Sequence, residues 1–416
     1  MSLRETGPDA NSTAEAVARR SYGKLIAFLA ARTRDVAAAE DALGDAFASA
    51  LKEWPVKGCP SNPEAWLMTV AKRKMIDLGR RRRISGSAER ELKLLAEELN
   101  EPMTDPDFPD HRLALMFACA HPAIDAAIRA PLILQTILGL DAERIASAFL
   151  ISPAAMGQRL ARAKAKIREA GIPFVVPETT ELPGRLEAVL DAIYAAFAEG
   201  WSDPDATDAA RRDLAEEAVY LGGLVSELLP DEPEALGLFA LMLHAEARRH
   251  ARRGANGEYV PLDEQDPARW VWPLIEQAEA LLERASALGA IGRYQLEAAL
   301  QSAHVDRCRT GNKNWPAVVQ LYDSLFALTA SPVVALNRAL ALEHTSGARG
   351  ALEAIEDLAA DPRFRSYQPY WAARASLLAK TGAHQEARRA YEIAIGLERD
   401  PAVRRFLIER QSALTE

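Results

Sequence analysis

The residues of this sequence that could carry chemistry are mainly lysines and arginines. Residues 143–168, ERIASAFLISPAAMGQRLARAKAKIR, place basic side chains at close intervals along a stretch with helical periodicity. Ammonium and guanidinium groups in such a row bind phosphate oxygens, and polar side chains near the start of a helix can reach base edges. The stretch therefore predicts contact with a nucleic acid.

The same stretch has the pattern of a helix-turn-helix. We expect a first helix over about 141–149 and a turn at LIS, after which Ser152 can cap a second helix with Pro153 at its first position. Such a second helix can lie in the major groove of DNA. A solvated, charged helix end is the alternative. The second helix also carries an ordered apolar stripe, which argues against that alternative: Met156, Leu160, Ala163 and Ile167.

A second basic helix is expected over 64–83, EAWLMTVAKRKMIDLGRRRR. Between residues 72 and 83, seven basic side chains stand against one acidic side chain, Asp77. Backbone charge together with an aromatic near the helix start suits a melted or distorted strand. An unspecific basic patch is the alternative. We expect its apolar face to be buried: Trp66, Leu67, Val70, Ala71 and Ile76.

The charge of the chain is divided unevenly. The whole sequence has a formal net charge of −9, yet residues 1–173 net +3 and residues 174–416 net −12. Such an asymmetry suggests a part that binds nucleic acid, joined to a part with another task.

Composition indicates an all-α protein of two to four domains. The 416 residues are rich in Ala, Leu, Glu and Arg, which are good helix formers. Cys59, Cys119 and Cys308 show neither disulfide nor zinc spacing, which favours a reducing cytoplasm. The N-terminus lacks the apolar core of a signal peptide, and no run approaches a membrane span. We therefore expect a cytoplasmic protein without membrane contact.

Catalytic constellations are not evident in the sequence. His111 and His121 flank Cys119, but a helix end with a buried thiol explains them better than a metal site. Phosphate-binding glycine loops and nucleophile motifs are missing. We expect no enzyme activity, no cofactor and no metal. Glu40, Asp41 and Asp45 lie on an exposed helical face that suits a basic partner.

The order of helices and breaks predicts the domain boundaries. Helical blocks at 14–84 and 111–172 are joined by a polar linker at 85–110, and the helix-rich remainder covers 184–416. This remainder contains an internal repeat, clearest at 370–397, which has the residue spacing of a tetratricopeptide repeat. A generic Ala-rich bundle is the alternative. Small residues mark the register of successive repeat units: Ala387, Ala351, Ala317 and, weakly, Ala278.

Three motifs together resemble bacterial extracytoplasmic-function sigma factors of the sigma-70 family. DVAAAEDALGDAFASALKEW (35–54) looks like their core-binding segment and PEAWLMTVAKRKMIDLGRRRR (63–83) like the following helix, while 143–168 looks like their fourth conserved region. The resemblance covers roughly 14–170. Later stretches, among them AVYLGGLVSELLPDEPEALGLFALMLHAEARR and YVPLDEQDPARW, resemble the subgroup with a long C-terminal tetratricopeptide extension.

The resemblance implies a partner for each part. Region 2 would bind the clamp of core RNA polymerase and the melted −10 element of a promoter, and region 4 would read the −35 element as duplex. The polymerase set is Glu40, Asp41, Asp45 and Phe47. The −10 set is Asn62, Arg73, Lys74, Asp77, Arg80, Arg81 and Arg82. The −35 set is Ser152, Ala155, Gln158, Arg159, Arg162, Lys164 and Lys166.

Two departures from the family pattern affect these expectations. Gly44 stands where relatives often have glutamine, which weakens one expected contact with core polymerase. Ala155 and Gly157 replace longer side chains, so readout of the −35 element shifts toward Gln158, Arg159 and DNA shape.

The acidic extension suggests regulation within the chain. We expect residues 184–416 to contact the sigma core, either masking its basic faces or adding a polymerase contact. A helix-turn-helix regulator with a tetratricopeptide sensor is the main alternative, and it leaves 35–83 unexplained. A scaffold that grips peptides through its repeats is a third interpretation.

Overall fold

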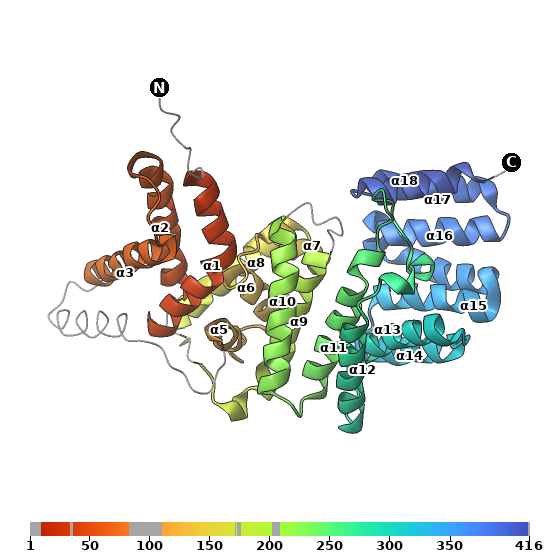
Figure 1. The fold of residues 1–416 in the computed structure, drawn as a ribbon, viewed down its shortest axis with the longest axis horizontal. Coiled ribbons are helices and arrows are strands. Elements are labelled where there is room, and N and C mark those ends of the chain that lie inside the picture. Colours follow the sequence, from red (N-terminus) through yellow and green to blue (C-terminus); the bar gives the residue numbers. More distant parts are fainter. Residues whose placement is uncertain are drawn as a thin grey trace. The chain divides into compact units, whose positions relative to one another are not determined.

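The structure is a computed structural model in which helices supply the regular structure. It describes residues 10–33, 36–82, 110–170, 172, 176–201 and 209–414. Within these ranges there is no strand, only one isolated antiparallel bridge between Arg253 and Tyr259. The predicted all-α fold is therefore confirmed. The chain forms two compact units, 1–228 and 229–416 (Figure 1).

The first unit begins with three helices that pack on one another: α1 (Ala10–Thr33), α2 (Val36–Lys57) and α3 (Pro63–Arg82). Their apolar faces meet at fully buried side chains that include Ile26, Leu43 and Leu67. In α3 the buried face is Leu67, Ala71 and Met75, at steps of four residues, whereas Ile76 is only half-buried. The sequence therefore predicted the buried face correctly at Leu67 and Ala71. Near the end of the helix, Met75 is buried in place of the adjacent Ile76.

Three short helices and one longer helix follow within the same unit: α5 (His111–Cys119), α6 (Ala126–Thr136) and α7 (Ala142–Ala148), and then α8 (Pro153–Ala170). The first three begin at aspartates, whose side chains accept hydrogen bonds from backbone N–H groups of the first turn. These caps stop the chain from continuing one helix into the next, because each aspartate holds its own backbone outside the helix. The capping aspartates are Asp110, Asp125 and Asp141.

Two longer helices complete the first unit: α9 (Pro183–Trp201) and α10 (Ala209–Leu228). The α9 helix packs against α5, α6 and α7, and one of its faces is fully buried. The sequence boundary at 184 assigned both helices to the extension, but the structure groups them with the helices of 110–170. The physical reason is burial, because helices as short as α5–α7 cover little apolar surface by themselves. The buried side chains of α9 include Leu186, Val189, Ile193 and Phe197.

The second unit is a succession of helices in which each packs on the next (Figure 1). Most of them carry proline in the first turn, where its missing N–H costs nothing. In chain order they are α11 (Pro233–Ala247), α12 (Trp272–Ala287), α13 (Arg293–Thr310), α14 (Trp315–Thr329), α15 (Pro332–Glu356), α16 (Gln368–Lys380), α17 (His384–Leu397) and α18 (Pro401–Ser412).

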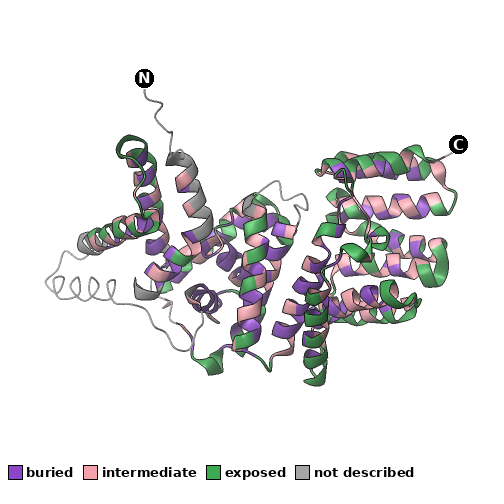
Figure 2. Ribbon diagram, viewed as in Figure 1, coloured by how far each residue is buried: buried purple, intermediate pink, exposed green. Residues whose placement is uncertain are grey.

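The stretch with the clearest repeat spacing forms a hairpin of two helices, α16 and α17. Ala375, Ala387 and Ala394 have no exposed surface, so the two helices approach closely. Gly382 has φ +83° between them, in the left-handed region that favours glycine. Figure 2 shows the alternation of buried and exposed positions along these helices, as expected for stacked amphipathic pairs. Their assignment to the tetratricopeptide family stays a prediction.

An excursion of irregular chain with short 3₁₀ turns interrupts the α-helices of the second unit between α11 and α12, as the Gly/Asn/Pro-rich composition of 253–269 predicts. It is anchored to α18, at the other end of the unit's sequence. Arg253 forms an ion pair with Asp400, the residue that caps α18. The Tyr259 ring lies edge-on to Phe406, with centroids 5.3 Å apart. These contacts join segments from near the two ends of the unit's sequence. They therefore stabilise the array of helices in addition to the packing of each helix on the next.

None of the helices that the structure describes is long and apolar enough to cross a lipid bilayer.

Glycine positions in α9 give a test of how the first unit is held together. A side-chain carbon on Gly200 would collide with backbone atoms of Arg211 and Ala215 in α10, whereas one on Gly184 would meet open space. We expect Gly200→Ala to lower the free energy of unfolding by about 1–3 kcal/mol through overpacking. Gly184→Ala is the matched control and should be neutral or stabilising by about 0.5 kcal/mol. Urea unfolding measures both, and equal effects of the two substitutions would contradict this packing.

Candidate functional site

The α7–α8 pair has the geometry of the predicted helix-turn-helix. The Ser152 hydroxyl accepts a hydrogen bond from Ala155 N at 3.3 Å, and Pro153 is the first residue of α8, so the predicted cap is confirmed. Leu150 has φ +54° in the turn between the helices. On α8 the apolar stripe faces the core: Met156, Leu160 and Ile167 are buried and Ala163 is half-buried.

Most of the −35 set faces solvent. Ser152, Gln158, Arg159, Arg162 and Lys166 are exposed on α8 and its cap. The first turns of α8 thus present one amide, two guanidinium groups and a hydroxyl to the surface, a combination that can contact both base edges and phosphates.

Two members of the −35 set lie differently. Ala155 is half-buried and offers only a methyl group. The Lys164 side chain is three-quarters buried, and its Nζ lies 2.6 Å from Glu40 Oε2, where it donates a hydrogen bond. Glu40 belongs to the polymerase set on α2. The structure therefore joins one member of each set in a partly buried ion pair.

The −10 set lies on α3 and its cap. The Asn62 side chain accepts a hydrogen bond from Ala65 N at 3.0 Å, so it caps α3. Arg73 and Asp77 are exposed, one turn apart. Lys74 Nζ lies 3.4 Å from Asp45 Oδ2, in an exposed pair that joins α3 to α2. The side chains of three further members lie outside the described part of the structure: Arg80, Arg81 and Arg82.

The aromatic side chain near the start of α3 is part of the packing between α2 and α3. Trp66 is half-buried and meets the buried Trp54 in an edge-to-face arrangement, with ring centroids 5.5 Å apart. Lys72 lies over the Phe28 ring of α1, with its Nζ 5.0 Å from the centroid. The aromatic residues of this part therefore hold the three helices together, and Phe28 orients one basic side chain of α3, Lys72.

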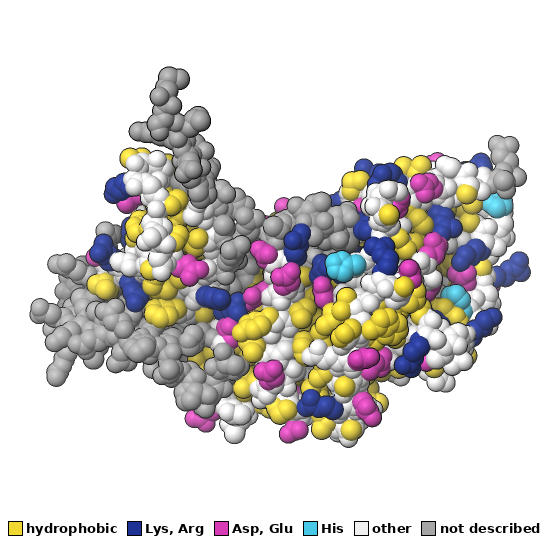
Figure 3. Space-filling model, viewed as in Figure 1, with side chains coloured by type: hydrophobic (Ala, Val, Ile, Leu, Met, Phe, Trp, Pro, Cys, Tyr) yellow, Lys and Arg dark blue, Asp and Glu magenta, His cyan; other side chains and the backbone are white. Residues whose placement is uncertain are grey.

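The polymerase set divides between two faces of α2. Asp41 and Asp45 are exposed, one turn apart. Glu40 and Phe47 point inward instead, and the Phe47 ring lies 6.4 Å from that of Tyr22 on α1. Burial, with a smaller contribution from the Glu40 carboxylate, raises the pKa of Tyr22 to about 12. Figure 3 shows acidic and basic side chains interspersed over the part of the surface formed by α2 and α3.

A cavity of about 1120 Å³ opens beside these residues within the first unit. Its walls come from α1, α2, the segment from α6 to α7, and α10. Glu40, Asp41 and Asp45 form one side, and Asp213, Glu216 and Glu217 of α10 form another. Basic groups also reach it, namely Lys24, Arg112, Arg144 and Lys164.

Carboxylates of α9 and α10 hold arginines of the preceding helices. Arg112 of α5 pairs with Glu217 of α10 as well as with Asp110. Arg144 of α7 donates to Glu199 of α9 at 2.9 Å, and Glu199 also lies 3.8 Å from Arg211. Sequence reasoning missed these pairs, because residues more than fifty positions apart give no local signal.

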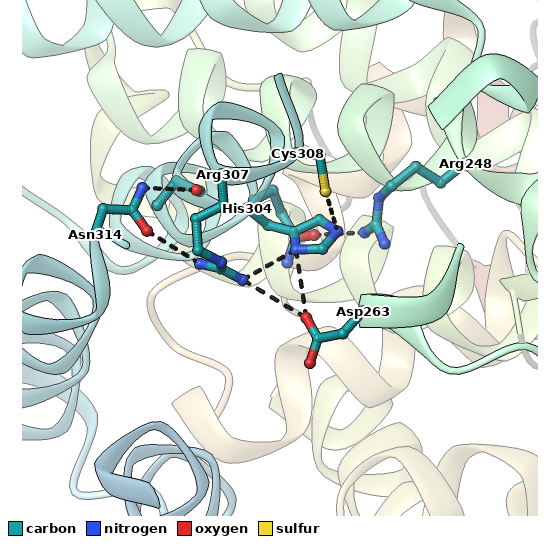
Figure 4. A network of polar contacts seen from close by, with 8 residues as sticks. Arg248, Asp263, His304, Arg307, Cys308 and Asn314 are labelled. Atoms are coloured by element: carbon teal, nitrogen blue, oxygen red, sulfur yellow. Dashed lines mark hydrogen bonds and ion pairs between the residues drawn. The ribbon is translucent and has the colours of Figure 1, made fainter. Parts of the chain in front are cut away.

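The second unit contains a polar network between α11, α13 and the start of α14 (Figure 4). Arg307 donates to His304 Nδ1 at 3.0 Å and to Asn314 Oδ1 at 3.3 Å, and its guanidinium lies 4.0 Å from the centroid of Trp315. The Cys308 sulfur lies 3.7 Å from His304 Nε2. Since Nδ1 accepts from Arg307, the imidazole is a neutral ring with its proton on Nε2.

The electrostatics of this network disfavour a reactive thiol. Burial raises the pKa of the Cys308 thiol above its ordinary value, although Arg307 opposes the effect. Burial, with Arg248 and Arg307 adding to it, lowers the pKa of His304 to about 3, so the ring cannot act as a charged partner near neutral pH. Arginines beside the ring also repel cations. Among the described residues no group of three or more His, Cys, Asp or Glu side chains could hold a metal ion.

Two buried histidines predict a pH dependence of folding. Burial is the main reason that the pKa of His244 falls to about 4, as it is for His304. Both nitrogens of the His244 ring lack a hydrogen-bond partner. Below pH 6.5 the two histidines bind protons in the unfolded chain but not in the folded chain. The free energy of unfolding therefore falls as pH falls, by up to about 1.4 kcal/mol per pH unit for each histidine.

We expect His244→Leu to make the free energy of unfolding less dependent on pH between pH 6.5 and about 4. The slope should fall by up to about 1.4 kcal/mol per pH unit, which is the contribution of one histidine. The exposed His250 provides the control substitution, His250→Leu, which should leave the slope as it is in the wild type. Chemical denaturation at a series of pH values measures the free energy of unfolding of each protein. Subtracting the wild-type value from that of the variant removes the contribution of carboxylates elsewhere, because both proteins share them. An unchanged slope in His244→Leu would contradict the burial of a neutral ring.

Comparison with known proteins places these features in a family. Residues 17–84 match sigma-70 region 2, and residues 185–286 match a family of unknown function (DUF6596). The chain is 38% identical over 375 residues to an uncharacterized protein of Rhizobium meliloti (strain 1021), an alignment that covers 88% of this chain and 87% of the relative. No solved structure matches. The chain therefore belongs to one family with the Rhizobium meliloti protein, and within it residues 17–84 are similar to sigma-70 region 2.

Proposed function

We propose that this protein is a sigma factor of the extracytoplasmic-function type, which binds core RNA polymerase and directs it to specific promoters. The observation that carries the proposal is the capped helix α8, which exposes Gln158, Arg159 and Arg162 in the same compact unit as the sigma-70 region 2 domain. A chain that carries both region 2 and a helix-turn-helix has one binding part for each of two promoter elements.

Readout of the −35 element falls mainly to Gln158 and Arg159. Gln can donate and accept at adenine, and Arg can bind guanine in a bidentate manner. Arg162 and Lys166 stand further along α8, where they suit phosphates. Because Ala155 is half-buried, the upstream half of the element is recognised through shape and deformability rather than through hydrogen bonds.

Region 2 offers opposite charges on adjacent helices. On α2, Asp41 and Asp45 present carboxylates that suit a basic surface of the polymerase clamp. On α3, Arg73 and Lys74 suit the backbone of a melted strand. Both side chains of the Lys74–Asp45 pair are more than two-fifths exposed to solvent. Breaking this pair so that Lys74 contacts DNA and Asp45 contacts the polymerase therefore costs little free energy.

The extension is proposed to regulate initiation within the chain. Residues 174–416 net −12 and follow two basic elements, so their field opposes the approach of DNA to the sigma core. Residues 185–286, which match the family of unknown function, begin in α9 and end in α12. This segment connects the first unit to the array of helices in the second unit. We therefore propose that it transmits the regulation from one unit to the other.

Transcription in vitro tests the proposed function directly. With core RNA polymerase of a bacterium that encodes a relative, such as Rhizobium meliloti, the protein should start transcripts at defined promoters. Replacing Arg159 with Ala should weaken promoter binding about 10-fold to about 100-fold, and adding Arg73→Ala should abolish initiation. Arg389→Ala, an exposed arginine of α17, is the control and should have no effect. Binding should also weaken steeply with salt, because phosphate contacts release counterions.

Specific binding to promoter DNA in the absence of polymerase, without polymerase-dependent initiation, would overturn the sigma-factor function in favour of a regulator that acts alone.

Truncation tests the role of the extension, and the structure decides where to cut. A cut near residue 180 removes α9 and exposes the apolar surface that it covers, so loss of activity there would reflect unfolding. A chain that ends at Leu228 keeps the whole first unit. We expect this chain to differ from the full protein at least several-fold in core affinity or promoter output. Equal values in both assays would contradict regulation by residues 229–416.

A further inference from the structure

The polar network of the second unit holds more positive than negative charge. Arg248 and Arg307 lie on opposite sides of the His304 ring (Figure 4). Arg248 is only 7% exposed, and it donates to the Gln301 side chain and to the His244 carbonyl, which are both uncharged. Among the described residues no carboxylate forms an ion pair with it. A buried guanidinium without a counter-ion makes its surroundings attractive to an anion.

Arg307 is held in a fixed orientation but has only a loose carboxylate partner. Its side chain is 14% exposed, and its guanidinium lies 4.0 Å from the centroid of Trp315 and donates to Asn314 Oδ1 at 3.3 Å. Trp315 is stacked in turn on His344, with ring centroids 3.6 Å apart. The carboxylate of Asp263 lies 3.8 Å from the guanidinium, which is beyond hydrogen-bond distance. A planar guanidinium oriented in this way can bind a carboxylate more closely than it binds Asp263.

The next residue along the same segment reaches a second cation. Glu264 accepts a hydrogen bond from Arg410 of α18 at 2.7 Å. The Arg410 guanidinium also lies over the Phe406 ring, 4.9 Å from its centroid. Because the two acidic residues are adjacent in the chain, the two arginines are spaced for two consecutive carboxylates. We call Arg307 and Arg410 the two-arginine site.

The two carboxylates that occupy this site are weakly held. The side chains of Asp263 and Glu264 are 64% and 57% exposed, and that of Arg410 is 51% exposed. Ion pairs as exposed as these contribute little to stability. Residues 254–264 include no buried position, whereas Gln265 directly after them is buried. Rotation of two exposed side chains is therefore enough to vacate the site without unfolding the unit.

We propose that the two-arginine site binds an acidic segment of a partner protein, and that Asp263 and Glu264 are built-in competitors for it. A partner segment with two consecutive carboxylates places one on each arginine, while Arg248 adds attraction from behind Arg307. A peptide fits better than a nucleic acid, because the present occupants are carboxylates on adjacent residues of a polypeptide. The site lies wholly within the second unit, so this proposal does not depend on the proposed sigma-factor function.

Fluorescence anisotropy with the full-length protein tests the site. The probe is fluorescein-labelled YVPLDEQD, the sequence of residues 259–266. We expect weak binding to the wild type, because the built-in carboxylates compete with the probe. The combined substitution of Asp263→Ala and Glu264→Ala should tighten binding at least about 10-fold, since the vacant site becomes the main state. Glu276→Ala with Glu283→Ala removes two exposed carboxylates of α12 and is the matched control, for which we expect wild-type affinity.

A second pair of variants locates the bound peptide. In the background of Asp263→Ala and Glu264→Ala, adding Arg410→Ala should weaken probe binding about 5-fold or more, because one charge-assisted contact is lost. Adding Arg389→Ala on α17 instead should leave the affinity unchanged. Both arginines are exposed, so circular dichroism should show unchanged helix content in both variants. The peptide DYVEPLQD has the same composition with separated carboxylates, and we expect it to bind about 5-fold more weakly or worse.

Each outcome decides for or against the site. Equal affinity of the probe for the wild type and for the protein without the two built-in carboxylates overturns the proposal, as does binding that survives Arg410→Ala. Equal binding of DYVEPLQD shows charge attraction without a site and overturns it as well. A single-stranded oligothymidylate that displaces the probe as readily as the unlabelled peptide overturns it in favour of a nucleic acid. A gain of affinity that requires both Arg410 and consecutive carboxylates supports it, whatever the result of transcription assays.

Discussion

The packing of α9 against α5, α6 and α7 is the constraint on which the first unit depends. The helices before it are short, and isolated helices of such length are marginal in water, so their apolar faces need a partner. The α9 helix supplies that partner with a buried apolar face, and Arg185 donates from it to the Phe117 carbonyl at 3.2 Å. The helix-turn-helix can therefore hold its exposed side chains in place only because the chain continues beyond it. The segment that matches the family of unknown function thus begins inside the first unit.

Charge pairing within this unit explains how a protein with a net charge of −9 can carry the helices that we propose to bind DNA. Some cations face outward, as Arg159 and Arg162 do, and are available to phosphates at once. Others are neutralised by carboxylates of neighbouring helices, as Lys164 is by Glu40 and Arg144 is by Glu199. The surface offered to nucleic acid is therefore smaller than the count of lysines and arginines suggests.

Much of the fold followed from local patterns in the sequence. Helical composition predicted the all-α class, Ser152 and Pro153 marked the start of α8, and the composition of 253–269 predicted the break before α12. These signals are local, since caps and turns are decided by residues within one helical turn. The sequence did not reveal that α9 and α10 join the first unit, nor that Lys164 pairs with a carboxylate 124 positions away. Such contacts depend on tertiary packing. The face of α3 was misjudged by one residue at its end because a single apolar position fits two adjacent faces equally well.

The central claim is that this chain selects promoters for RNA polymerase, and mapping transcript starts in cells tests it most directly. Overproduction of the protein in Rhizobium meliloti, followed by sequencing of transcript 5′ ends, should reveal a set of new starts. The account predicts that these starts share two sequence elements, near −35 and −10, and that they vanish when the overproduced chain carries Arg159→Ala. New starts without a common upstream element, or starts that persist unchanged with Arg159→Ala, would contradict it.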